Sequence, residues 1–122
     1  MSSFVCINNL SDLSNNLESP KEFIKEKLSG EKISGIFFYS NAVNEFLDEA
    51  RLTEWLEYSS SEGISLYACR NSLIKRNISE GINPLINVVG LGQLIEGVLS
   101  NNKTIVIGSL WRILFSISFQ EI

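Results

Sequence analysis

The sequence predicts an α/β fold with three layers, in which helices cover both faces of a mainly parallel, five-stranded sheet. Short apolar segments alternate along the chain with segments of helical periodicity, and residues 33–39 (ISGIFFY) are apolar almost throughout. Runs of that kind are typical of strands buried on both faces of a parallel sheet. The length of 122 residues, with 44% hydrophobic and 20% charged residues, fits one globular domain.

The first strand is predicted at Phe4–Ile7, a short apolar run that ends at two asparagines. A helix is predicted to follow from Ser19, which can cap it, with Pro20 at its first position and Glu22 completing a capping box. Gly30 ends this helix. Its inward-facing residues are expected to be Phe23, Ile24, Lys27 and Leu28.

The middle of the chain repeats the alternation. Residues 33–39 form the second strand, and residues 41–51 fit either a loop or a short helix. A helix ended by Gly63 follows, and residues 64–68 form the third strand, with Cys69 at its carboxyl end. Residues 71–76 are expected to form a short helix. The face of the longer helix is marked by Leu52, Trp55, Leu56 and Ser59.

The last part contains a turn at 81–87, a short strand at Val88–Val89, a helix that opens at Gly90 and a fifth strand at 104–107. Gly90 and Gly92 are expected to allow close packing of this helix on a strand; a nucleotide-binding loop there lacks the third glycine and the Lys-Ser/Thr pair. One face of the helix is expected to carry Leu91, Leu94, Ile95, Val98 and Leu99.

The segment 110–122 fits both a strand, through Phe115, Ile117 and Phe119, and a helix, through Trp111 and Leu114. We therefore expect a domain at 1–109 and an apolar extension at 110–122 that packs on the domain or on a partner.

The composition excludes several classes of function. The chain contains no histidine, which removes Ser-His-Asp and Cys-His catalysis and histidine metal sites. The formal net charge of −4 argues against a nucleic-acid-binding surface spread over the whole domain. The N-terminus does not resemble a signal peptide, and no apolar run is long enough for a membrane span. We expect a cytoplasmic protein with no metal or cofactor and no direct contact with nucleic acid or membrane.

Cys69 is the strongest candidate site residue. Sites in parallel sheets gather beyond the carboxyl ends of strands, and a helix N-terminus stabilises a thiolate. Arg70 adjoins it, and Lys75 and Arg76 follow. The alternative is that Cys69 is a small buried hydrophobic residue, which free cysteine often is. Cys6, inside an apolar strand, is expected to be structural, and burial is expected to raise its pKa.

The acidic residues of the middle region are expected to form a solvated face, without an acid/base pair. These residues are Asp48, Glu49, Glu54 and Glu57.

Three sequence blocks resemble the DsrE/TusD group of sulfur-relay proteins. They are Gly35–Tyr39 with Val43-Asn44, Ile64–Cys69 leading to Lys75-Arg76, and Val89–Glu96 leading to 105–108; Trp55 falls where the family often has a tryptophan. The resemblance implies a DsrE/F-like fold and matches Cys69 to the sulfur-accepting cysteine. Because Arg70 adjoins Cys69, we expect it to stabilise the persulfide anion together with the helix N-terminus. Residues 77–87 are shorter than usual in that group, and 110–122 extend beyond its usual end.

The resemblance further implies a hetero-oligomeric sulfurtransferase subunit. Its expected partners are TusB-like and TusC-like subunits, a TusA-like sulfur donor and a TusE/DsrC-like acceptor, and its expected end product is the 2-thiouridine of tRNA wobble positions. The alternatives are a relay subunit in dissimilatory sulfur oxidation, a non-catalytic assembly subunit, and a small-molecule-binding α/β domain, which no phosphate loop supports.

Overall fold

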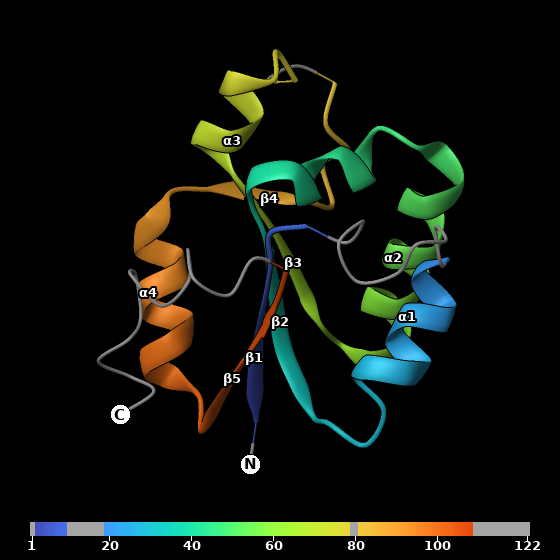
Figure 1. Ribbon diagram of the computed structural model, residues 1–122, viewed down its shortest axis with the longest axis vertical. Coiled ribbons are helices and arrows are strands. Elements are labelled where there is room, and N and C mark those ends of the chain that lie inside the picture. Colours follow the sequence, from blue (N-terminus) through green and yellow to red (C-terminus); the bar gives the residue numbers. More distant parts are fainter. Residues whose placement is uncertain (1, 10–18, 79–80, 109–122) are drawn as a thin grey trace.

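The computed structural model describes residues 2–9, 19–78 and 81–108. Five parallel strands form one sheet in the order β4-β3-β2-β1-β5. Figure 1 shows α1 and α2 on one face of the sheet and α4 on the other, so the predicted three-layer fold is confirmed. The elements are β1 (Ser3–Ile7), α1 (Pro20–Lys27), β2 (Ile33–Phe38), the 3₁₀ helix η1 (Ser40–Phe46), α2 (Glu49–Glu62), β3 (Ser65–Cys69), α3 (Arg70–Lys75), β4 (Asn87–Val89), α4 (Leu91–Ser100) and β5 (Lys103–Ile107).

The N-terminus of α1 forms as its sequence predicts. The Ser19 hydroxyl accepts a hydrogen bond from the Glu22 backbone N–H at 3.3 Å, and Pro20 occupies the first turn, where its missing N–H costs nothing. Phe23 and Leu28 are buried and Ile24 is partly buried. The inward orientation predicted for Lys27 is wrong, because Lys27 is exposed and its charge stays in water.

The segment 41–51, which fitted either a loop or a helix, divides into two elements. Most of its first half belongs to η1, and α2 begins at Glu49 after an Asp48 cap that accepts a hydrogen bond from the Arg51 N–H at 3.0 Å. Gly63 ends α2 with a φ of 67°, a left-handed conformation that glycine adopts without steric cost.

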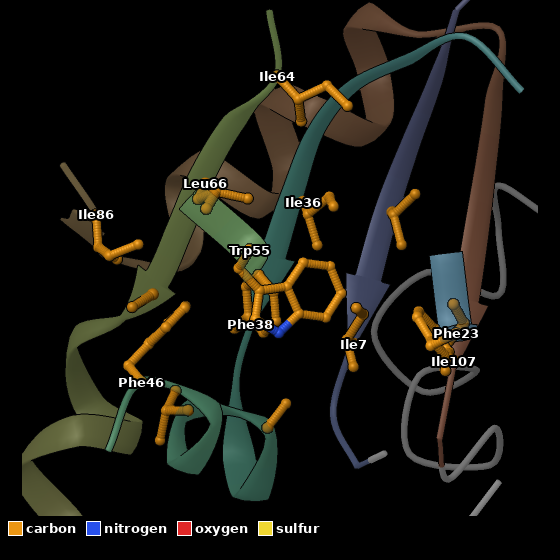
Figure 2. Close-up of a cluster of buried hydrophobic side chains, with 14 of the residues drawn as sticks. Ile7, Phe23, Ile36, Phe38, Phe46, Trp55, Ile64, Leu66, Ile86 and Ile107 are labelled. Carbon is orange, nitrogen blue, oxygen red and sulfur yellow. The ribbon is translucent and has the colours of Figure 1, made fainter. Parts of the chain in front are cut away.

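The core between the sheet and α1/α2 is built around Trp55, which has no exposed surface. Figure 2 shows its indole ring among side chains from β1, β2 and β3. The ring meets Phe38 edge-on at 5.0 Å between centroids and Phe23 at 6.1 Å. Its Nε1 donates a hydrogen bond to Glu45 Oε1 at 3.0 Å, so the single polar atom of the indole is satisfied.

The opposite face of the sheet packs on α4 through Leu94, Gly97 and Val98. Gly90 and Gly92 have open space where a Cβ would stand, so the close packing predicted for them is wrong. Close approach occurs instead at Gly97, where an added Cβ would lie 2.4 Å from Cζ of Phe4.

The apolar face predicted for α4 is only partly buried. Leu94 and Val98 lie in the core, whereas Leu91, Ile95 and Leu99 are 53%, 55% and 64% exposed. The exposure differs because residues four apart lie in one line along a helix. The line of Leu94 and Val98 faces the sheet, and the line of Leu91, Ile95 and Leu99 does not.

The extension predicted at 110–122 lies outside the described residues. Among the helices of the described ranges, none combines the length and the apolar character that a membrane crossing requires.

Candidate functional site

The carboxyl ends of the parallel strands all meet at one end of the sheet, where α3 and η1 also lie (Figure 1). Polar residues follow two of these strand ends directly. Asn8 comes after β1 and is buried, and its Nδ2 donates a hydrogen bond of 3.1 Å to the hydroxyl of Tyr39, which comes after β2. This end of the sheet is where ligand and catalytic sites of open α/β folds are found.

Cys69 lies at the same end, as the last residue of β3 and the N-cap of α3. It pairs with Val89 of β4. On the other side of β3, Phe38 of β2 pairs with Ala68. The next residue after Phe38, Tyr39, therefore lies beside Cys69. The predicted location of Cys69, between a strand end and a helix N-terminus, is therefore confirmed.

The Cys69 side chain points toward the α4 face of the sheet and is 4% exposed. It belongs to an apolar cluster that Tyr39, Tyr67 and Val89 border. Within the described part of the chain, its side chain makes no capping hydrogen bond to α3. The thiol is thus covered in this conformation, and a reaction with a second protein requires the covering side chains to move.

Arg70 follows Cys69 directly and is exposed. Its Nη2 donates a long hydrogen bond of 3.5 Å to the carbonyl oxygen of Val88, which ties α3 to β4. A pocket of about 210 Å³ lies beside this contact, lined by Arg70, Leu73, Ile74 and Val88.

The far side of α3 is fastened to η1 by two further hydrogen bonds. The Ser40 N–H donates to the Ser72 hydroxyl at 2.8 Å, and Arg76 Nη2 donates to Asn41 Oδ1 at 2.7 Å. Ser40 has a φ of 54°, a left-handed conformation that bends the chain directly after β2. These contacts hold the helix that begins at Cys69 against the strand ends.

Cys6 differs from Cys69 in both place and chemistry. It lies in the middle of β1, between Phe37 of β2 and Val106 of β5, with no exposed surface. Burial raises its pKa to about 12, because the surrounding apolar groups cannot solvate a thiolate. The structural interpretation of Cys6 is therefore supported.

The predicted acidic face is solvated as expected. Asp48, Glu49 and Glu57 are exposed, and the partly buried Glu54 accepts a hydrogen bond from the Lys21 N–H at 3.1 Å. Among the residues described, no group of three potential metal ligands is present.

The sequence interpretation missed Asn8 and Tyr39 as residues of this end of the sheet. The signal available was their position, since each directly follows an apolar strand. Glu45 was missed as well. It accepts hydrogen bonds from Arg51 Nε at 2.9 Å and from Trp55 Nε1, which makes it a structural residue of the η1–α2 junction.

The sequence profile of the DsrE/DsrF-like family matches residues 7–107, and the chain belongs to this family. The family is associated with sulfur relay. A search of curated proteins found no match. Among solved structures, the crystal structure of the YchN protein from E. coli is similar, with 19% identity, a TM-score of 0.61, and coverage of 88% of this chain and 100% of YchN. That likeness concerns the fold.

Proposed function

We propose that the protein is a sulfurtransferase subunit that carries sulfur as a persulfide on Cys69. The position of Cys69 carries this proposal: in a chain of the DsrE/DsrF-like family, it is the cysteine that ends a central strand and begins a helix at the carboxyl end of the sheet. The other thiol, Cys6, is enclosed in the sheet and its pKa is raised to about 12, so it supplies no thiolate near neutral pH.

The transfer consists of two thiol exchanges with no net oxidation. The Cys69 thiolate attacks the outer sulfur of a donor persulfide, the S–S bond of the donor breaks, and the donor cysteine leaves as a thiolate. The new S–S bond joins Cys69 to the transferred sulfur. An acceptor thiolate then attacks that sulfur, and Cys69 leaves as a thiolate. The chain has no histidine, so protons exchange with water and with the partner cysteines.

This chemistry requires that the persulfide of another protein can reach Cys69. A side chain with 4% exposure cannot meet a persulfide on another protein in an in-line attack. We propose that docking of the donor displaces the residues around Tyr39 and Val89. Arg70 is exposed, and the hydrogen bond that it makes to the Val88 carbonyl within the described residues is long, at 3.5 Å, so the guanidinium can then turn toward the persulfide anion.

The proposed relay has a TusA-like donor, a TusE/DsrC-like acceptor and TusB-like and TusC-like neighbouring subunits, and it ends in 2-thiolation of wobble uridine in tRNA. The alternative destination is dissimilatory sulfur oxidation. The donor, the acceptor and the neighbours follow from the family resemblance.

Transfer of radiolabelled sulfur tests the role of Cys69. The protein is incubated with a cysteine desulfurase, its carrier protein and ³⁵S-cysteine, and label is measured on non-reducing gels. We expect label on the wild type and on Cys6→Ala, which is the matched control, but not on Cys69→Ala. Label on Cys69→Ala would refute the assignment.

A second candidate function is a non-catalytic subunit of the same kind of complex. The 4% exposure of Cys69 favours it, because a buried cysteine can serve packing alone. Labelling and subunit binding together distinguish the two candidate functions. Absence of label on the wild type and on both variants, together with intact binding to TusB-like and TusC-like subunits, would support the assembly subunit.

A further inference from the structure

One face of α4 is apolar and uncovered among the described residues. Leu91, Ile95 and Leu99, here called the α4 stripe, are each more than half exposed and lie four residues apart. Side chains with this spacing form a continuous line, which on α4 is about 12 Å long at 1.5 Å per residue. A line of three large aliphatic side chains is the kind of surface that a partner or another segment covers.

We infer that the C-terminal segment of the same chain, residues 110–119, covers the α4 stripe. The first support is where the described chain ends. Gly108 follows Ile107 at the carboxyl end of β5. Because α4 leads into β5 through a two-residue connection and both lie along the sheet, α4 runs opposite to β5, and Leu91 at its start lies at the same end of the sheet as Gly108.

The conformation of Gly108 fixes the point from which this segment departs. Its φ is 121°, and an added Cβ would lie 2.0 Å from Oδ1 of Asn8, which is buried. The chain therefore leaves β5 in a backbone conformation that favours glycine, tight against the β1 end. It cannot simply continue as β5 with an ordinary side chain at position 108.

The length of the remaining chain is sufficient. Residues 109–122 are fourteen residues. Fully extended, they span about 46 Å, whereas the ten residues of α4 extend about 15 Å. A segment that starts beside Leu91 can run along the whole stripe and still contain a turn.

The chemistry of the segment matches the stripe. Its apolar residues are Leu110, Trp111, Ile113, Leu114, Phe115, Ile117 and Phe119. Its one basic residue is Arg112, and the one charged residue of α4 is Glu96, next to Ile95 on the exposed side of the helix. Covering the stripe removes apolar surface from water on both partners, at roughly 25 cal/mol per Å².

Site-specific photocrosslinking of the full chain tests this inference. The photoreactive residue p-benzoylphenylalanine replaces Ile95, which is exposed and so tolerates the change, and crosslinked peptides are identified by mass spectrometry. A mixture of ¹⁵N-labelled and unlabelled protein distinguishes links within one chain from links between copies. The matched control carries the same residue at Glu57, exposed on α2 across the sheet.

We expect crosslinks from position 95 to residues 110–119 of the same chain, none from position 57 to that segment, and their loss when Leu91 and Leu99 are both changed to Lys. Crosslinks between copies would show that a second copy occupies the stripe and would overturn the inference. Crosslinks to another segment, or none at all, would overturn it as well.

Discussion

The ring of Phe4 in β1 occupies the space that the missing side chain of Gly97 in α4 leaves free. An added Cβ at Gly97 would lie 2.4 to 2.6 Å from three ring carbons. The ring has little room to move, because it is buried and Gly35 of β2 is so close that a Cβ there would lie 3.3 Å from Cε1 of the same ring. The absence of a side chain at Gly97 therefore allows α4 to lie this close to the sheet.

Gly97→Ala should consequently destabilise the protein. Alanine is favoured over glycine in a helix by about 1 kcal/mol, but overpacking a core costs about 1–3 kcal/mol, and contacts this short fall at the upper end. Gly92→Ala, on the same helix with open space around it, is the matched control and should stabilise slightly. Urea denaturation measures both. A Gly97→Ala protein as stable as Gly92→Ala would contradict the packing described.

The stability of the protein should fall with pH above 9 because of Cys6. Its thiol has a pKa of about 12 in the folded protein against an ordinary value of 9.0, so the unfolded chain loses this proton first. The free energy of unfolding then decreases by up to about 1.4 kcal/mol per pH unit as pH rises from 9 toward 12.

Cys6→Ala isolates this effect, since it removes the thiol and leaves all other titrating groups in place. The stability difference between wild type and Cys6→Ala should shrink by roughly 1 kcal/mol between pH 8 and pH 10. Urea denaturation at the two pH values measures it, and a constant difference would show that Cys6 is not held neutral by burial.

Cys69 should react slowly with a bulky thiol reagent in the isolated protein. With 4% exposure, the thiol is reached only in opened conformations, and an opening that costs about 3 kcal/mol slows a reaction roughly a hundredfold. Reaction with a nitrobenzoate disulfide reagent follows the rate, with Cys6→Ala used to observe Cys69 alone. Addition of the donor protein should accelerate the reaction. Equal rates for folded and unfolded protein would mean that Cys69 is not covered.

Glu45→Ala should destabilise the junction between η1 and α2 by about 1–3 kcal/mol, because it leaves the buried Trp55 Nε1–H and the Arg51 guanidinium without their acceptor. Glu45→Gln, which keeps an acceptor oxygen, should cost less. Thermal denaturation ranks the two variants, and a Gln variant as unstable as the Ala variant would show that the charge, not the hydrogen bond to the indole, is what matters.

The order and type of the elements could be predicted from the sequence where the signals are local. Ser19 and Pro20 mark a helix start through groups within three residues, and Gly63 ends α2 through its own backbone conformation. The position of Cys69 was predictable for the same reason, since an apolar run ends there. These features depend on neighbours along the chain and not on the rest of the fold.

Features that depend on several strands at once could not be predicted. Periodicity indicates that α4 has an apolar side, but only packing on Phe4 and Phe37 determines that Leu94 faces the sheet while Ile95 does not. The cover over Cys69 has the same origin, because Tyr39 follows β2 and Val89 ends β4, so the two side chains are far apart in the sequence.

The pairing of β1 with β5 has a consequence for synthesis of the chain. Ser3 pairs with Lys103 and Ile7 with Ile107, so one side of β1 pairs with β5, the last strand among the described residues. While the ribosome produces the residues between them, at about 5–20 per second, that side of β1 keeps its backbone N–H and C=O groups unpaired. A nascent chain released before residue 107 emerges exposes an interior strand, apolar from Phe4 to Ile7, to pairing with other chains, and premature termination therefore yields a product prone to aggregation.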